Sequence, residues 1–199
     1  KLPGGERISY CEVTPRAVPK MIKKTLVEGS IYDENFLGRY SENGNTDEAH
    51  PDINKNDFFK RQMKVVLQNC GVVDPTSIDA YIAHGGFKAL DKVLRHLKPE
   101  EVVKSVLESG LRGRGGGGFP TGKKWDFALK QKADQKYIIC NADEGDPGAF
   151  MDRSLLESDP FRVIEGMIIG GYAIGASAGY IYCRAEYPLA ISRLEESIA

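Results

Sequence analysis

The densest concentration of residues suited to ligand binding lies at residues 111–125. The sequence there is Leu-Arg-Gly-Arg-Gly-Gly-Gly-Gly-Phe-Pro-Thr-Gly-Lys-Lys-Trp, so Gly113 and Gly115–Gly118 stand among basic and aromatic side chains. Glycine lets a backbone adopt positive φ and approach a ligand closely, and successive N–H groups can then surround phosphate oxygens. A flexible linker would more often carry serine and other polar residues. We therefore predict that this segment, the glycine loop (residues 113–119), binds a phosphate or a nucleotide, with a plain tight turn as the alternative.

Two common phosphate-binding motifs fit the glycine loop only in part. From Gly117 the sequence matches a P-loop as far as Lys124, which stands where Ser or Thr should bind magnesium. The dinucleotide pattern Gly-x-Gly-x-x-Gly fits Gly113, Gly115 and Gly118. That pattern normally follows a strand, whereas here a predicted helix precedes it. A different phosphate-binding arrangement is therefore expected.

A second polar cluster, the acidic loop (residues 141–150), follows a predicted strand at 136–140. It contains Asn141, Asp143, Glu144 and Asp146. Ligands of open α/β sheets bind beyond the carboxyl ends of the strands, where these side chains would lie. An amide suits the edge of a flavin ring, and carboxylates accept hydrogen bonds from ribose or ribityl hydroxyls. Two alternatives stay open at this point, a solvated turn around the Asp-Pro pair and a Mg²⁺ site.

The elements that must position the two loops are mostly helices marked by proline at their starts and glycine at their ends. Pro15, Pro75, Pro99 and Pro160 each stand where a first helical turn is expected. The pattern predicts strands at 7–13, 136–140 and 179–183, and helices at 15–29, 58–69, 75–85, 87–97, 99–110, 159–176 and from 187 onward. Strand, helix, strand and helix over 136–199 indicate a parallel sheet. Since the sequence stops inside a predicted helix after two strands, we expect an incomplete α/β domain.

Composition excludes several classes of protein. The chain has 199 residues, 28% charged, with a formal net charge of −1, which gives no field for nucleic acid or an anionic membrane. No apolar run approaches the ~20 residues of a membrane span, and no signal peptide is evident. The four cysteines are isolated at positions 11, 70, 140 and 183, so we expect no zinc site or iron–sulfur cluster among them. Isolated reduced thiols point to the cytoplasm.

The two loops together resemble a known family. Residues 113–125 and the run Tyr-Ile-Ile-Cys-Asn-Ala-Asp-Glu-Gly-Asp-Pro-Gly-Ala-Phe-Met-Asp-Arg at 137–153 are similar to the NADH-binding flavoprotein subunit of respiratory complex I. They are more similar still to the matching subunit of soluble NAD(P)-linked hydrogenases, including electron-bifurcating ones. The resemblance covers about residues 58–199 and implies hydride transfer between a nicotinamide nucleotide and FMN, then single electrons to iron–sulfur clusters outside this segment.

The resemblance also implies which residues bind the cofactors. Around FMN it implies Gly113, Arg114, Gly115, Lys124, Asn141, Asp143 and Glu144, and around NAD(H) or NADP(H) it implies Gly116, Gly117, Phe119 and Phe127. Asp146 departs from the glutamate of the respiratory form, which reaches the nucleotide. No catalytic side chain and no metal ligand are expected in this chain, because the hydride chemistry belongs to the cofactors.

The resemblance implies a domain organisation as well. Residues 1–29 would be the tail of a thioredoxin-like ferredoxin domain, 30–56 a linker, 57–110 a helical block, and 111–199 a truncated, Rossmann-like FMN- and NAD(P)H-binding α/β domain. The family's later acidic loop and its four-cysteine [4Fe–4S] motif are not in this sequence, so we expect a segment that is inactive alone and works with iron–sulfur partner subunits. An inert docking fragment and an NTPase-like phosphate-binding module are the alternative functions.

Overall fold

The computed structural model describes residues 6–40 and 48–199, and it divides the chain into two compact units, residues 1–64 and 65–199. Residues 1–5 of the predicted thioredoxin-like tail and residues 41–47 of the predicted linker lie outside the described residues. Among the described residues, no helix is long and apolar enough to cross a membrane.

The first unit is built on an antiparallel pair of short strands. Strand β1 (Arg7–Tyr10) pairs with strand β2 (Phe36–Tyr40), and the connection carries helix α1 (Val18–Ile22) and one π-helical turn, η1 (Lys23–Val27). The predicted strand and helix at 7–13 and 15–29 are therefore present, although each is shorter than expected. Strand β2 falls inside the range predicted as a linker, 30–56, so that prediction missed an ordered element.

Strand β2 depends on a close backbone approach that is not visible in the local sequence. Gly38 lies against the 3-10 helix η2 (Ile53–Lys55), and a Cβ atom at Gly38 would stand 2.6 Å from Cβ of Ile53. Ile53 is buried. Glycine is therefore needed here for packing, whereas the sequence alone indicated only a polar, glycine-containing connection.

The second unit begins with four helices, α2 (Ile78–Ala83), α3 (Lys88–His96), α4 (Pro99–Glu108) and α5 (Thr121–Lys130). Helices α3 and α4 match their predicted ranges closely. The prediction of a helix over 58–69 was wrong, because only turns, a bend and irregular backbone occur there. Phe58 and Met63 are 70% and 89% exposed. Since most helical stability in proteins comes from burying an apolar face, these residues lack what a helix would need.

The remainder of the second unit is a parallel strand pair with crossover helices. Strand β3 (Tyr137–Ala142) leads through α6 (Met151–Ser158) and α7 (Pro160–Ile174) to strand β4 (Ala178–Cys183), and α8 (Pro188–Ile198) follows. The two strands pair in parallel, with Ile138 opposite Gly179. The α/β class and the parallel pairing are thus confirmed. Helices α5 and α6 were not predicted.

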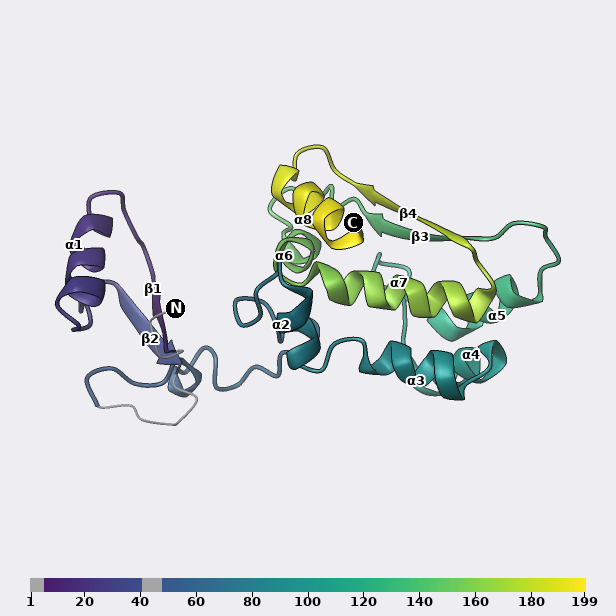
Figure 1. Ribbon diagram of the computed structural model, residues 1–199, viewed down its shortest axis with the longest axis horizontal. Coiled ribbons are helices and arrows are strands. Elements are labelled where there is room, and N and C mark those ends of the chain that lie inside the picture. Colours follow the sequence, from purple (N-terminus) through teal and green to yellow (C-terminus); the bar gives the residue numbers. More distant parts are fainter. Residues whose placement is uncertain (1–5, 41–47) are drawn as a thin grey trace. The chain divides into compact units, whose positions relative to one another are not determined.

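Helix α7 is the centre of packing in the second unit. It runs alongside the β3–β4 pair, with α3, α4 and α5 near its C-terminal half and α6 and α8 near its start (Figure 1). Ala173 of α7 is fully buried with side chains of α3 and α4, and Phe161 at its start stacks on Tyr81 of α2 with ring centroids 5.7 Å apart. A separate cluster joins α6 and α8 to β3. Helix α7 therefore contributes a buried residue to two of the three apolar clusters in the described part of the chain, and the third lies at the end of β3, where the acidic loop begins.

A buried carboxylate on α7 fixes the start of α3. Glu165 accepts hydrogen bonds from the hydroxyl of Tyr81 at 2.5 Å and from the backbone N–H groups of Phe87 and Leu90 at 3.0 and 3.1 Å. Phe87 has a left-handed backbone, with φ of 59°, which favours glycine over bulky residues. Burial, together with the hydrogen bond to Glu165, raises the pKa of Tyr81. The Glu165 carboxylate thus accepts hydrogen bonds from amides at the start of α3 that have no partner within the helix, as a capping side chain does.

The two parallel strands are covered on one face. Ile138, Cys140 and Ala142 point toward the helices, whereas Tyr137 and Ile139 are 49% and 65% exposed. The buried-strand pattern predicted for both strands is therefore corrected to a half-buried one, since within the described residues helices cover a single face of the pair.

Candidate functional site

The glycine loop is closed at its base by backbone hydrogen bonds. The N–H of Gly113 donates to the carbonyl of Phe119 at 2.9 Å, and the N–H of Thr121 donates to the carbonyl of Leu111 at 2.9 Å. The guanidinium of Arg112 donates to the carbonyl of Gly118 at 3.1 Å. The loop therefore has a defined shape that links the end of α4 to the start of α5, rather than the free path of a linker.

The four consecutive glycines of this loop face open space. A Cβ atom added to any of Gly115–Gly118 would meet nothing within 4 Å. Gly116 and Gly118 also have positive φ, 92° and 59°. Their glycine requirement is thus conformational, whereas at Gly115 no neighbouring atom in the chain excludes a side chain. Open space beside exposed backbone amides is the arrangement that an anionic ligand needs.

Helix α5 presents its N-terminus directly after the loop. Its first turn has no side-chain cap, and Pro120 occupies the N-cap position. Gly122 holds the helix against α4, because a Cβ atom there would stand 2.4 Å from the backbone nitrogen of Leu107. Uncapped amides and the positive end of the helix dipole favour an anion at this point.

Basic and aromatic side chains surround the same loop. Arg114 and Lys124 are exposed, and neither makes a hydrogen bond or ion pair through its side chain with any residue in the described part of the chain. The Lys123 ammonium lies 6.0 Å from the ring centroid of Phe127, and the rings of Phe119 and Phe127 are 6.5 Å apart. The two aromatic rings predicted to contact the nicotinamide nucleotide are thus brought together, with the Lys123 ammonium beside one of them.

The acidic loop begins at the carboxyl end of β3, as predicted. Asn141 lies within the strand, and its side-chain oxygen accepts a hydrogen bond from the N–H of Asp143 at 3.1 Å. The Asp143 carboxylate lies 3.7 Å from the guanidinium of Arg184, and Asp146 is exposed. The Glu144 carboxylate has a different environment from the one the sequence suggested. Its two oxygens accept hydrogen bonds from the backbone N–H groups at 152 and 153, each at 3.1 Å, and so cap α6.

Burial changes the titration of groups next to the acidic loop. Desolvation, with a smaller effect from Glu144, raises the pKa of Asp152 above its usual range. Desolvation likewise raises the pKa of the Cys140 thiol, with additional contributions from Asp152 and Cys183. All four cysteines are free thiols. Partial burial of Asp152 and Cys140 therefore disfavours their charged forms next to the acidic loop.

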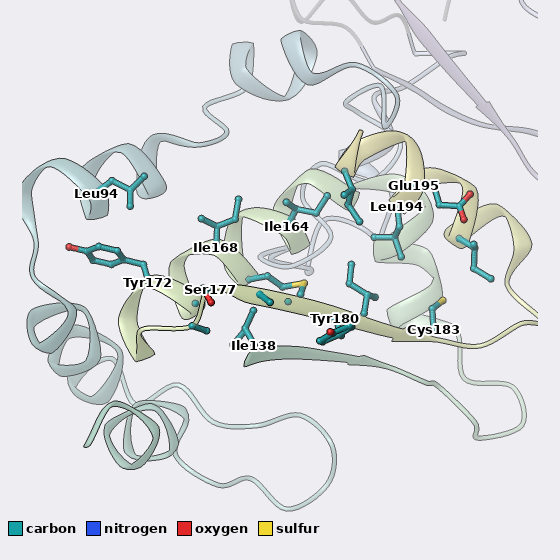
Figure 2. Close-up of a pocket in the computed structure, with 18 residues that line it drawn as sticks. Leu94, Ile138, Ile164, Ile168, Tyr172, Ser177, Tyr180, Cys183, Leu194 and Glu195 are labelled. Atoms are coloured by element: carbon teal, nitrogen blue, oxygen red, sulfur yellow. The ribbon is translucent and has the colours of Figure 1, made fainter. Parts of the chain in front are cut away.

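The glycine loop and the acidic loop make no described polar contact with each other. No hydrogen bond or ion pair among the described residues joins the glycine loop to the acidic loop, and no group of three or more His, Cys, Asp or Glu in that part of the chain could hold a metal ion. A cavity of about 850 Å³ lies elsewhere, beside α7, β4 and α8 (Figure 2). Its lining residues include Ile164, Tyr180 and Leu194, and none of the predicted site residues.

Comparison with known proteins identifies the segment that carries both loops. Residues 106–199 match the family model described as the Nuo51 FMN-binding domain. The resemblance found in the sequence is confirmed. The matched segment, residues 106–199, therefore contains every residue that the sequence predicted for the site.

Curated relatives agree with this family. The chain is 62% identical over 139 residues to the NADP-reducing hydrogenase subunit HndC of Solidesulfovibrio fructosivorans, covering 70% of this chain and 28% of that protein. It is 51% identical over 135 residues to one subunit of the NADH-quinone oxidoreductase of Rhizobium meliloti, covering 68% and 32% of the two chains. The chain thus spans about a third of the length of these relatives or less.

A solved structure resembles the same region. A chain from the crystal structure of an NAD+-reducing [NiFe]-hydrogenase in the air-oxidized state matches 68% of this chain and 22% of its own length, with 34% sequence identity and a TM-score of 0.54. The match supports the helix-and-strand arrangement described above.

Sequence reasoning missed residues that hold the acidic loop in place. Arg184 and Tyr187 follow strand β4 and donate hydrogen bonds to the loop backbone. The parallel pairing of β3 and β4 could have indicated them, because the carboxyl ends of parallel strands lie at the same edge of a sheet.

Proposed function

We propose that this chain is part of an NAD(P)H-dependent flavoprotein that transfers electrons through FMN. One observation carries the proposal. The segment that matches an FMN-binding family also contains a closed glycine loop, with open space along four glycines and an uncapped helix N-terminus next to it. These features fit a phosphate-bearing cofactor, since amides and a helix dipole attract anions.

The proposed binding roles divide between the two loops. The glycine loop and its neighbours would hold the FMN phosphate and ring through Gly113, Arg114, Gly115 and Lys124. Gly116, Gly117, Phe119 and Phe127 would contact NAD(H) or NADP(H), with an aromatic ring stacking on a base. Asn141, Asp143 and Asp146 would hydrogen-bond to the flavin or to ribose and ribityl hydroxyls. For Glu144 we propose an indirect role, because its carboxylate is engaged at the N-terminus of α6.

The chain's own contribution to the reaction is binding and orientation. FMN held by these residues would supply hydride acceptance from the nicotinamide ring and release of electrons one at a time. Arg114 and Lys124 neutralise phosphate charge, and the glycine amides fix the position of the phosphate. The loop at the end of β3 aligns the flavin edge through Asn141. No side chain is required as a general acid or base.

The wider setting is proposed on the same basis. HndC is named as a subunit of an NADP-reducing hydrogenase, and we propose a comparable assembly in which iron–sulfur clusters on other segments or subunits receive the electrons. We further propose that the parallel strands belong to a Rossmann-like sheet, that residues 1–29 are the tail of a thioredoxin-like domain, and that the protein is cytoplasmic.

Substitution of Lys124 tests the proposal directly. Lys124→Ala should weaken FMN binding by about 1.5–3 kcal/mol, the range for hydrogen bonds to charged groups. That corresponds to roughly a 10- to 150-fold rise in Kd. Fluorescence titration of FMN-depleted native protein measures the change. Lys130→Ala is the matched control, because Lys130 lies at the other end of α5 and pairs with Asp126. Equal FMN affinity in the parent and in Lys124→Ala would remove this lysine from the site, and a parent that binds no FMN would overturn the proposed function.

A further inference from the structure

The backbone carbonyl of Glu144 in the acidic loop accepts two hydrogen bonds from the segment that follows β4. The guanidinium of Arg184 donates to it at 2.7 Å, and the hydroxyl of Tyr187 donates to it at 3.1 Å. Glu144 follows β3, so these bonds connect the carboxyl ends of the two parallel strands. The conformation of the acidic loop is thus coupled to residues about forty positions later in the chain.

Glu144 is also held in place through its side chain. The two carboxylate oxygens of Glu144 accept the backbone N–H groups of Asp152 and Arg153. Main chain and side chain of one residue therefore make four hydrogen bonds, two to the start of α6 and two to the segment after β4. Because Asp143 and Gly145 flank Glu144 directly, their backbone positions are constrained with it.

Arg184 is the residue that joins these contacts. Its guanidinium lies 3.2 Å from the Glu186 carboxylate and 3.7 Å from that of Asp143, in addition to the hydrogen bond to the loop carbonyl. It also stacks over the ring of Tyr187, 5.5 Å from the centroid, while Arg153 approaches the same ring at 5.3 Å. Tyr187 is 7% exposed, so the ring is a buried support contacted by two guanidinium groups. Removing the Arg184 charge would release the carbonyl, the ring and one loop carboxylate together.

We infer that Arg184 is a positioning residue that sets the acidic loop for flavin binding, with Tyr187 as its buried support. Arg184 acts through the Glu144 carbonyl and the Asp143 carboxylate, and it need not touch the flavin. The inference rests on the proposed function, because it assumes that this loop contacts FMN. It predicts that FMN affinity depends on a side chain after β4 that carries none of the binding groups assigned to the two loops.

Arg184→Gln and Arg193→Gln form a matched pair of variants. The side chains of both arginines are 25% exposed, and each lies 3.2 Å from a nearby glutamate, Glu186 in one case and Glu196 in the other. Arg193 lies on α8 and makes no described contact with the acidic loop. Both substitutions thus remove one comparable ion pair, and only the first also removes the contact with the loop. Thermal unfolding of both variants measures the stability that each substitution removes, and we expect the lower melting temperature in Arg184→Gln because it also loses the loop contacts.

Two measurements on the native protein separate the inference from a general loss of stability. In Arg184→Gln, FMN affinity should fall at least tenfold and backbone hydrogen exchange across residues 143–149 should accelerate, whereas Arg193→Gln should match the parent in both. Arg184→Lys should recover part of the affinity, because an ammonium can reach the carbonyl but cannot also span to Glu186 as a planar guanidinium does. Unchanged affinity or unchanged exchange in Arg184→Gln would overturn the inference.

A third variant decides the case if Arg184→Gln fails to fold. Tyr187→Phe keeps the buried ring and removes only the hydroxyl that donates to Glu144. It should weaken FMN binding severalfold and accelerate exchange in the same loop, and parental values in both would overturn the inference. Hydrogen exchange needs no cofactor, so a loop effect in a protein that binds no FMN would mean that the proposed function has failed while the coupling is real. The role in flavin binding inferred for Arg184 would then be refuted.

Discussion

Gly115, like Gly117, is a position in the glycine loop where a side chain can be added with little effect on folding. A Cβ atom there would meet nothing within 4 Å, and Gly115 is not among the glycines with positive φ. Gly116 and Gly118 also face open space, but their φ values of 92° and 59° would strain any other residue. Gly115→Val therefore tests ligand contact, whereas substitution of Gly116 or Gly118 would also test backbone conformation.

The expected magnitude follows from the space that the side chain would fill. The branched carbons of valine would project into the volume that we assign to the FMN phosphate and ring. Introducing extra carbons into a well-packed contact costs about 1–3 kcal/mol. That cost corresponds to roughly a 5- to 150-fold rise in the Kd for FMN. Since nothing in the chain opposes the new side chain, the melting temperature of the protein without FMN should stay near the parental value.

Fluorescence titration with FMN and thermal unfolding, both on the FMN-depleted native protein, measure the two effects. Gly166→Ala is the control, because Gly166 lies in α7 and a Cβ atom there also meets nothing within 4 Å. This variant should bind FMN as the parent does. Parental FMN affinity in Gly115→Val would refute the assignment of the glycine loop to the cofactor. A large loss of thermal stability would show instead that the open space above Gly115 is filled by protein.

Three further predictions concern stability and thiol chemistry. Glu165→Ala should lower the free energy of unfolding by about 3 kcal/mol, because three hydrogen bonds of ~1 kcal/mol each are lost. Urea unfolding measures this free energy, and a change below about 1 kcal/mol would contradict the capping role. Gly122→Ala should destabilise the folded chain by about 1–3 kcal/mol, because the new Cβ atom would stand 2.4 Å from the backbone nitrogen of Leu107. An unchanged melting temperature would refute this packing of α5 against α4. Alkylation at mildly alkaline pH should modify exposed Cys11 well before Cys140, because burial raises the pKa of the Cys140 thiol. Mass spectrometry of the labelled peptides gives the order of modification, and labelling of Cys140 before Cys11 would contradict this prediction.

Helices with local start signals could be predicted from the sequence. Pro99 and Pro160 each begin a helix in the structure, as expected from their fixed φ and missing N–H. Helix α5 was missed because it starts immediately after the glycine loop and carries Gly122 in its first turn. That glycine is required by contact with α4, and such a contact is invisible in a single sequence.

The ends of other elements depend on distant residues. Helix α6 has no capping side chain at its own N-cap, and the Glu144 carboxylate, seven residues upstream of Met151, serves its first amides instead. The sequence therefore identified Glu144 as a binding residue without revealing that its carboxylate is engaged within the fold. The opposite error occurred at 58–69, where apolar residues suggested a helix that the structure does not form, and several of these side chains remain exposed.

The binding loops were easier to locate than to assemble. Glycines in a row and acids after a strand are signals that need no tertiary knowledge, and the family match covers both loops. The pairing of Phe119 with Phe127 also follows from proximity along the chain. The support supplied by Arg184 and Tyr187 could not be read locally, because it depends on the register of β3 with β4.

The central claim is that this chain takes part in binding FMN that a nicotinamide nucleotide can reduce. Anaerobic absorbance spectroscopy of the native, FMN-loaded protein during titration with NADH and then NADPH tests it most directly. The account predicts that one FMN per chain is retained and that its visible absorption band is bleached by at least one of the two nucleotides. Failure to retain FMN, or a retained flavin that neither nucleotide bleaches, would contradict the account.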